Sequence, residues 1–192
     1  MPAPELVTQR LLLRGWRESD LDPFAAINAD PEVTRFLGGP LSAEASDALV
    51  ARFVEHFERH GFGLWAVEPR EDGELADFVG LAGFVGLSVP RFETHFTPCV
   101  EIGWRLGRRF WGRGIAIEAA REALRFGFVD ADLAEIVSFT VPANTRSRSV
   151  MERLGMRRDP DGDFEHPALP AGHPLRPHVL YRLERRSWLC AG

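Results

Sequence analysis

The chain has 192 residues, which is long enough to bury a core, and we expect residues 1–192 to form a single domain. Its 28 acidic residues outnumber its 23 basic ones, and the formal net charge of −5 offers no basic field that would draw it to nucleic acid or to a membrane surface. All 23 basic residues are Arg, and the lack of Lys excludes Walker-type phosphate loops and Schiff-base catalysis.

The first third of the chain predicts one strand followed by two helices. Residues 10–16, RLLLRGW, are typical of a strand, and Asp20 is expected to cap a short helix after it. Residues 42–60 carry apolar side chains at helical spacing, which predicts a longer helix ended by Gly61.

A hairpin is predicted next, and then the clearest strand of the chain. Residues 63–69 and 77–89 are typical of two antiparallel strands, joined by an acidic turn at residues 70–75. Residues 99–106, CVEIGWRL, alternate apolar with other side chains, which is the pattern of a strand. The apolar members of this strand are Val100, Ile102, Trp104 and Leu106.

A turn containing Gly112 and Gly114 follows, and after it a helix and an interior strand at residues 135–141. The expected apolar stripe of the helix consists of Ile117, Ala120, Leu124 and Phe128, and its polar side of Glu118, Arg121, Glu122 and Arg125. A strand, turn, helix and strand form a crossover unit. The two strands are therefore predicted to be parallel, with the glycine turn at the carboxyl end of the first.

The last part of the chain predicts a helix at residues 146–154, closed by Gly155. A loop rich in Pro and His is expected at residues 159–177, and a final strand at residues 178–185. The one Tyr of the chain, Tyr181, lies in this strand and is expected in the core.

The glycine turn has the properties of an anion site. The first N–H groups of a helix have no intrahelical partner, and glycines at that point let an anion approach them. A dinucleotide fingerprint does not fit, because Ile117 stands where its third glycine is needed, and a Walker loop lacks its Lys. The alternative is a tight turn that binds nothing.

Residues 111–116, WGRGIA, resemble the acyl-CoA signature Q/R-x-x-G-x-G/A of the Gcn5-related N-acetyltransferases (GNAT), with Trp111 at the first position. Trp in that place, with the Glu-Ala that follows at Glu118, is similar to the RimJ/RimL branch of ribosomal-protein N-terminal acetyltransferases. A competing register would start at Arg109. We prefer Trp111, because the family has an apolar strand residue five positions before its signature, and Leu106 stands there.

Further segments resemble the same branch in the right order: TQRLLLR near the start, the GLWAV strand, and PANTRSRSVMERLGM at residues 142–156. The resemblance implies an α/β (α+β) GNAT fold, a mixed and mostly antiparallel sheet that splays at two central parallel strands, with helices on both faces. It also implies acetyl transfer from acetyl-CoA, as co-substrate, to a primary amine. The implied cofactor-binding residues are Trp104, Leu106, Trp111, Gly112, Arg113, Gly114, Ile115, Ala116, Asn144 and Ser147.

The resemblance also implies catalytic roles. The N–H of Leu106 would polarise the thioester carbonyl. Many relatives donate a hydrogen bond to the leaving thiolate from a Tyr, but Met151 stands there, so Ser147 is the candidate donor. Glu101 is the candidate base, acting through a water, and the alternative is an ordinary solvated or Arg-paired carboxylate. His166, in the loop expected to wall the acceptor site, is the alternative base.

For Asn144 and Ser147, a helix cap is an alternative role that is compatible with the implied one. Cys99 and Cys190 lie far apart, which favours a reducing, cytoplasmic setting, and no metal site or membrane segment is expected. Neither Cys lies in the motif region, so direct transfer without a covalent enzyme intermediate is expected, with Cys99 as the one to check.

The acceptor amine is not identified by the sequence. A ribosomal-protein N-terminus suits the acidic balance of the chain, and a small molecule such as an antibiotic, a polyamine or an amino acid is the alternative. Because Met151 replaces the usual Tyr, a CoA-binding sensor or partner module without transfer activity is a rival of a different class. A homodimer is left open.

Overall fold

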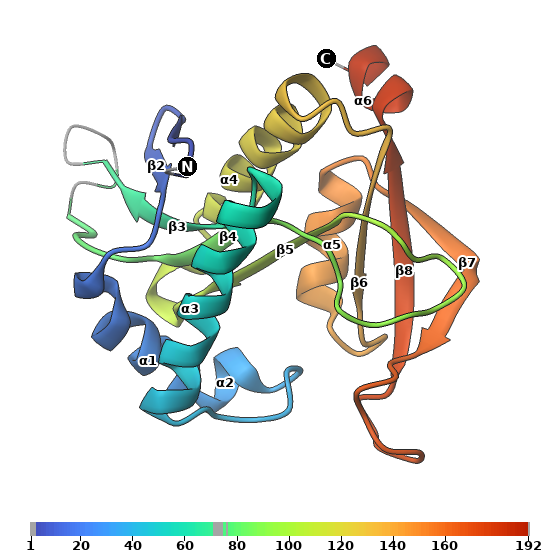
Figure 1. The fold of residues 1–192 in the computed structure, drawn as a ribbon, viewed down its shortest axis with the longest axis horizontal. Coiled ribbons are helices and arrows are strands. Elements are labelled where there is room, and N and C mark those ends of the chain that lie inside the picture. The colour runs from blue at the N-terminus through green and yellow to red at the C-terminus, as the bar shows by residue number, and fades with distance from the viewer. Residues whose placement is uncertain (1–2, 71–74, 76, 192) are drawn as a thin grey trace. The chain divides into compact units, whose positions relative to one another are not determined.

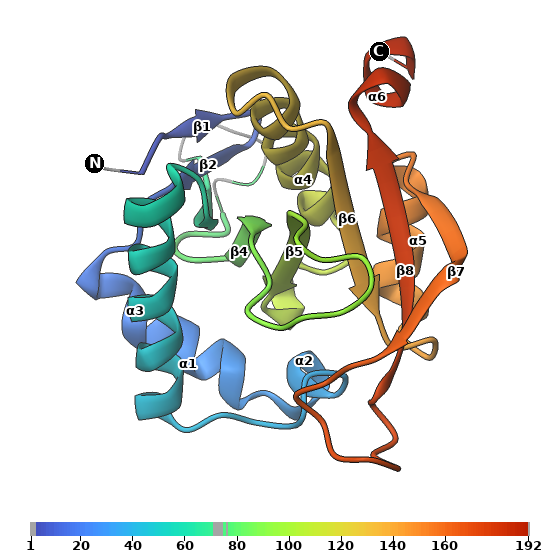
Figure 2. The same ribbon diagram turned by 45° about the vertical axis from the view of Figure 1, so that its right-hand side comes forward.

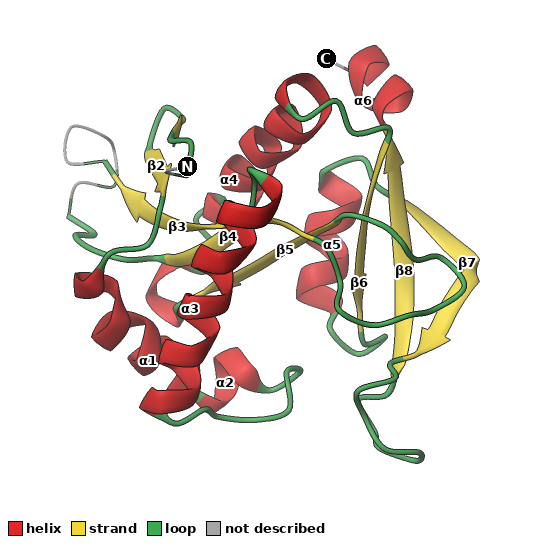
Figure 3. Cartoon of the chain, in the orientation of Figure 1, coloured by secondary structure: helices red, strands yellow, loops and turns green. Residues whose placement is uncertain are grey.

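The computed structural model describes residues 3–70, 75 and 77–191. It divides into two compact units, the first made of Met1–Ser88 with Gly103–Ala123 and the second of Val89–Ile102 with Leu124–Gly192. Strand β5, Glu101–Leu106, begins in the second unit and ends in the first. Figures 1 and 3 show the elements. The expectation of a single domain stays a prediction.

The first unit contains strands in the order β1-β2-β3-β4-β5, and the pairs from β1 to β4 are antiparallel. The bounds of the first four strands are Leu6–Val7, Leu11–Arg14, Leu64–Pro69 and Gly83–Ser88. The predicted strand and hairpin are therefore confirmed, with β4 starting later than expected. In the predicted acidic turn, residues 71–74 lie outside the described residues.

The helices of the first unit are α1 (Leu21–Ala29), α2 (Pro31–Thr34), α3 (Ala43–His60) and the start of α4 (Ile115–Arg125). Helices α1 and α3 lie side by side (Figures 1 and 2). They cover a core made of Phe24, Val50, Ala66, Leu81 and Phe84.

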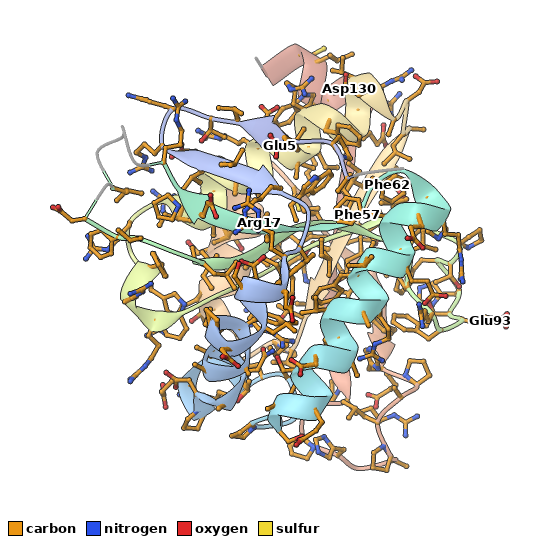
Figure 4. All side chains as sticks on the ribbon, turned by 60° about the vertical axis from the view of Figure 1, so that its left-hand side comes forward. Glu5, Arg17, Phe57, Phe62, Glu93 and Asp130 are labelled. Atoms are coloured by element: carbon orange, nitrogen blue, oxygen red, sulfur yellow. The ribbon has the colours of Figure 1, made fainter. Side chains whose placement is uncertain are left out.

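Helix α3 has the predicted ends. The Ser42 side chain accepts a hydrogen bond from the Ala45 N–H, and Gly61 ends the helix in the left-handed region at φ +74°. Phe57 lies in the last turns of α3 (Figure 4), and its ring centroid is 5.2 Å from that of Trp65. The sequence signals at both ends of this helix were therefore sufficient to place it.

Asp20 precedes α1 as expected, but its carboxylate does not cap that helix. It instead accepts hydrogen bonds from Nη1 and Nη2 of Arg14, at 2.7 and 2.9 Å, and from the Arg17 N–H. Arg14 is only 3% exposed, and Glu68 is its second anionic partner. A buried guanidinium requires such partners, and this requirement outweighs the capping preference of Asp20.

The second unit contains strands in the order β5-β6-β8-β7. The bounds of the last three strands along the chain are Glu135–Thr140 for β6, Arg157–Glu165 for β7 and Pro177–Glu184 for β8. Figure 2 shows β8 between β6 and β7. Strands β5 and β6 are parallel, as predicted, with Glu101 opposite Val137, and the other two pairs are antiparallel. The mixed, mostly antiparallel sheet of an α/β fold is thus confirmed.

Helix α5, Thr145–Arg153, agrees with the prediction and is closed by Gly155 at φ +80°. Helix α6, Arg185–Ala191, was not predicted. Within the described residues, no helix combines the length and the apolar character that a membrane crossing needs.

The predicted loop at residues 159–177 is wrong in its first part, because β7 extends to Glu165. Strand β7 pairs with β8 on both sides of an irregularity between Asp159 and Phe164. A Cβ at Gly162 would lie 2.5 Å from the Leu180 side chain, so a larger residue there would require this side chain to move. A β-bulge accommodates the Pro and Gly that the sequence pattern assigns to a loop.

The predicted stripe of α4 is correct only in part. Ala120 and Leu124 are buried, and Phe128 is buried in the π-helical turn, Phe126–Asp130, that follows the helix. Ile117 is only half-buried, and Glu118 is not on a solvated face. The buried apolar side chains that complete the stripe are Ile115, Ala119 and Ala123.

Candidate active site

The glycine turn lies between the end of β5 and the start of α4. A 3₁₀ turn at Arg108–Phe110 leads into Gly112 and Gly114, with φ of +73° and +79°. A Cβ at Gly112 would meet no atom within 4 Å, and one at Gly114 would meet only the Arg10 side chain at 3.4 Å. Both glycines are exposed, so an anion has free access to this backbone.

The backbone of the turn presents N–H groups to that space. The Gly114 carbonyl accepts a bond from the Glu118 N–H at 3.0 Å, so helical hydrogen bonding begins at Gly114. The N–H groups of Ile115, Ala116 and Ile117 precede any helical acceptor and lie at the positive end of the helix dipole. The turn and the helix start therefore form a site suited to a phosphate.

Two arginines flank the turn. The Arg113 guanidinium lies 4.0 Å from the Phe78 ring centroid, and its Nε donates to the Arg109 carbonyl at 3.1 Å. Arg109 in turn donates from Nη2 to the Val79 carbonyl at 2.9 Å. These contacts hold both positive charges beside the turn.

Hydrogen bonds among Thr8, Arg10, Arg113 and Glu118 support the turn. The sequence did not reveal this group of bonds, which we call the brace. Arg10 donates from Nη2 to the Arg113 carbonyl at 3.2 Å and from Nε to the Glu118 carboxylate at 2.6 Å. The Thr8 hydroxyl also donates to Glu118, at 2.6 Å. Burial opposes ionisation of Glu118, but the hydrogen bonds from Thr8 and Arg10 outweigh it and lower the pKa of the carboxyl. Glu118 is the Glu of the Glu-Ala pair, which was the only sequence signal for this brace.

Trp111 connects the turn to β5. Its indole Nε1 donates to the Leu106 carbonyl at 2.7 Å. The bond joins the first residue of the proposed signature to the strand residue five positions before it, and so it supports the register that begins at Trp111. The proposed role of Leu106 uses its N–H, which this bond does not engage. Trp104, two residues earlier on β5, is half-buried.

In the second unit, Asn144 and Ser147 contact one another at the start of α5. The Asn144 Nδ2 donates to Ser147 Oγ and to Thr140 Oγ1, both at 3.0 Å, and its Oδ1 accepts from the Ser147 N–H at 3.3 Å. Asn144 is thus the cap of α5, as the alternative prediction held. The Ser147 hydroxyl accepts the Asn144 bond and keeps its own hydrogen to donate.

Neither Met151 nor Tyr181 is placed to donate to a thiolate. Met151 is 1% exposed, in the core. Tyr181 is also 1% exposed, as predicted, and its hydroxyl donates to Glu152 at 3.0 Å and accepts from Arg148 at 3.3 Å. Neither side chain therefore occupies the role of the Tyr that many relatives use as the thiolate donor.

The Glu101 side chain has no hydrogen bond or ion pair with the described residues. Burial raises the pKa of its carboxyl to about 8. No arginine among the described residues pairs with this carboxylate, which is partly exposed. Burial and then the charge of Glu101 raise the pKa of the neighbouring Cys99 thiol to about 11, so Cys99 is a thiol at neutral pH and a poor nucleophile.

His166 lies at the end of β7, within an aromatic cluster. Its ring centroid is 4.7 Å from that of Phe92 and 5.0 Å from that of His178, and its Nδ1 accepts from the Ala168 N–H. Burial, and then the charge of His178, lower the pKa of His166. The described residues hold no group of three or more His, Cys, Asp or Glu side chains that could bind a metal ion.

The predicted residues thus form two groups. The first unit brings together the turn at residues 111–116, Leu106 and Trp104, with the brace from Arg10 and Glu118. The second unit brings Asn144 and Ser147 into contact. Glu101 and His166 also belong to the second unit, and in the described part of the chain no hydrogen bond or ion pair joins them.

A family model described as an acetyltransferase (GNAT) domain matches residues 10–157. The FsC-acetyl coenzyme A-N(2)-transacetylase of Aspergillus fumigatus is 33% identical over 190 residues, covering 97% of this chain and 78% of the relative. The ribosomal protein uS5-alanine N-acetyltransferase of Escherichia coli is 22% identical over 202 residues, covering 98% and 94%. A crystal structure of an acetyltransferase from Agrobacterium tumefaciens has a TM-score of 0.73 and 27% identity, covering 96% of each chain.

These similarities extend over most of the chain and include the glycine turn and the strand before it. The family uses acetyl-CoA as its co-substrate, which agrees with a phosphate-binding turn at the start of α4. The chain therefore belongs to the Gcn5-related N-acetyltransferases, in their RimJ/RimL-type branch, and is an acetyl-CoA-dependent N-acetyltransferase.

Proposed function

We propose that this N-acetyltransferase transfers the acetyl group to a primary amine by direct attack of the amine on acetyl-CoA in a ternary complex. The observation that carries the proposal is the 2.7 Å bond from the Trp111 indole to the Leu106 carbonyl. It fixes the phosphate-binding turn relative to the strand end where the thioester is to be polarised. The turn and the end of β5 then form one rigid segment, which positions both the pyrophosphate and the thioester of the bound acetyl-CoA.

The pyrophosphate of acetyl-CoA binds the backbone amides of residues 112–116, since the Trp111 N–H already donates to the Arg108 carbonyl at 3.0 Å, and Arg113 adds charge from the side. The pantetheine arm follows β5 past Trp104, and the Leu106 N–H donates to the thioester carbonyl. That N–H stabilises the negative charge that develops on the carbonyl oxygen when the amine attacks. The exposed turn and the open space at Gly114 support this assignment.

Glu101 acts as the general base, through a water molecule. An α-amino group has a pKa near ~8 and must lose its proton before it attacks. The buried Glu101 carboxyl, with its pKa raised to about 8, is a stronger base than an ordinary carboxylate and matches the amine that it serves. His166 is the alternative, and its lowered pKa makes it the weaker base.

Ser147 donates to the departing thiolate of CoA, and Asn144 steadies the pantetheine arm. The bond from Asn144 Nδ2 to Ser147 Oγ supports this role, because it leaves the Ser147 hydrogen as the available donor. Met151 in the core favours a second candidate function, a CoA-binding module without transfer activity. Turnover distinguishes the two, since both require CoA binding.

The proposal has two versions, which differ in the class of the amine that accepts the acetyl group. One relative carries the name of a ribosomal-protein alanine acetyltransferase and another that of an FsC-acetyl-CoA transacetylase, so a protein N-terminus and a small-molecule amine both have a precedent. A cytoplasmic location and a homodimer remain predictions from the sequence.

The test is release of free CoA thiol from acetyl-CoA, measured against peptides with free N-termini, polyamines, amino acids and aminoglycosides. Turnover with at least one amine, first order in both substrates at low concentration and without a burst of acetyl-enzyme, is the expected result. Tight acetyl-CoA binding with no thiol release from any amine would support the binding module instead.

A further inference from the structure

Arg105 lies next to Leu106 on β5. The positive charge of its side chain has few partners in the protein. Its Nη1 donates to Asn28 Oδ1 at 2.6 Å, and its guanidinium lies 5.5 Å from the Phe84 ring centroid. Its Nε is closed off from solvent and has no hydrogen-bond acceptor. Among the described residues, no carboxylate pairs with Arg105, and one neutral amide is its only hydrogen-bond partner.

Asn28 is held so that its oxygen faces Arg105. It is fully buried, and its Nδ2 donates to Ser46 Oγ at 2.8 Å, which joins helix α1 to helix α3. The amide is thereby oriented before any ligand binds, and Arg105 is positioned by it. A side chain that is aligned in this way, with its outer N–H groups unpaired, is suited to ligand recognition.

Several other arginines of the first unit have anionic partners, while Arg109 and Arg113, which contact carbonyls and aromatic rings instead, are exposed. Arg14 pairs with Asp20, Arg10 with Glu118, and the exposed Arg108 with Asp30 at 2.7 Å. Arg105 departs from this pattern although burial lowers its pKa only to about 10, so it stays positively charged at neutral pH. A buried cation without an anion is costly, and a ligand anion is the group that relieves the cost.

We infer that Arg105 binds a carboxylate of the acceptor, so that the preferred substrates are amines that also carry a carboxylate, such as free amino acids. The inference rests on the proposed function, in which the thioester lies at the N–H of Leu106, the residue next to Arg105. A carboxylate accepts two parallel bonds from a guanidinium and neutralises it, whereas an amide or hydroxyl oxygen only accepts a bond. Arg105 is partly exposed, and its outer N–H groups are open to such a group.

The test compares α-amino acids with the same amino acids as primary amides, and with diamines that lack a carboxylate. Thiol release is measured at equal concentrations of neutral amine, because an amide and a free acid differ in the pKa of the α-amine. The wild-type protein is expected to prefer the acid over its amide by about 10- to 100-fold in kcat/KM, the range of one charge-assisted hydrogen bond.

Arg105→Gln keeps a hydrogen-bond donor for Asn28 and removes the charge. It is expected to raise KM for the acids until acid and amide react equally, with no change in KM for acetyl-CoA. Arg105→Lys should restore part of the preference. Arg108→Gln, which removes an exposed charge three residues along, is the matched control and should leave the ratio of acid to amide unchanged.

A wild-type protein that acetylates only amines without a carboxylate, or that prefers the amides, would overturn the inference without any variant. So would an Arg105→Gln protein that lowers turnover of acids and amides by the same factor, since that is the signature of a structural role. Failure of the proposed function looks different: acetyl-CoA does not bind, or no amine of any class releases thiol.

Discussion

Replacing Gly114 with Ala separates backbone strain from loss of the phosphate site. Gly114 has φ +79°, a conformation that costs an L-residue about 1–2 kcal/mol, and a Cβ there meets only the Arg10 side chain at 3.4 Å. We expect the free energy of unfolding to fall by about that amount and no more. Gly155, at φ +80° with nothing within 4 Å of an added Cβ, is the matched control and should lose the same stability.

Binding of acetyl-CoA should distinguish the two variants. A methyl group at residue 114 stands in the space through which the pyrophosphate reaches the amides. Loss of one charge-assisted hydrogen bond costs about 1.5–3 kcal/mol, which corresponds to a Kd about 10- to 100-fold higher. Gly155→Ala lies outside the turn, and its Kd should equal that of the wild type.

Calorimetric titration gives the Kd for acetyl-CoA, and denaturant unfolding gives the stability of the same preparations. An unchanged Kd in folded Gly114→Ala would show that the turn does not bind the phosphates. Equal losses of affinity in both variants would show that a general loosening of the fold, and not the site, is responsible.

Three further predictions concern the residues around the turn and the base. Trp111→Phe and Trp16→Phe each remove an indole hydrogen bond of 2.7 Å to a backbone carbonyl, so the free energy of unfolding of both variants should fall by about 0.5–1.5 kcal/mol in denaturant unfolding. Only Trp111→Phe should also lower kcat/KM in the thiol assay. Ser147→Ala should lower kcat more than it raises KM for acetyl-CoA, while Ser149→Ala, an exposed position on the same helix, should do neither. Glu101→Gln should lower kcat/KM about 100-fold and leave only the ionisation of the amine in the rate profile, where the wild type shows two, that of the amine and that of Glu101 near pH 8. Because the folded pKa of Glu101 is raised from 4.5 to about 8, the wild type should also lose stability relative to Glu101→Gln as pH rises from about 4.5 through 8.

The sequence predicted the elements whose signals are local. Residues 99–141 carry the alternation of a strand, two glycines, helical spacing and a second apolar run, and the parallel pair of β5 and β6 follows from that order. Helix α3 follows from its apolar side chains at helical spacing and from Gly61, which ends it. These signals depend on neighbours in the chain, so no knowledge of the fold was needed.

The features that were missed depend on residues far apart in the sequence. Residues 159–165 of β7 have the local pattern of a loop, because the pairing with β8 that accommodates Gly162 is not visible in the sequence. The brace from Arg10 to Glu118 joins residues 108 positions apart. The raised pKa of Glu101 comes from burial, which the sequence of β5 alone does not show.

A structure of the complex with acetyl-CoA tests the central claim most directly. The account predicts pyrophosphate oxygens within hydrogen-bond distance of the amides of residues 112–116, with the thioester carbonyl accepting from the Leu106 N–H. A pyrophosphate centred two residues earlier, on a register that starts at Arg109, or a thioester away from Leu106, would contradict it.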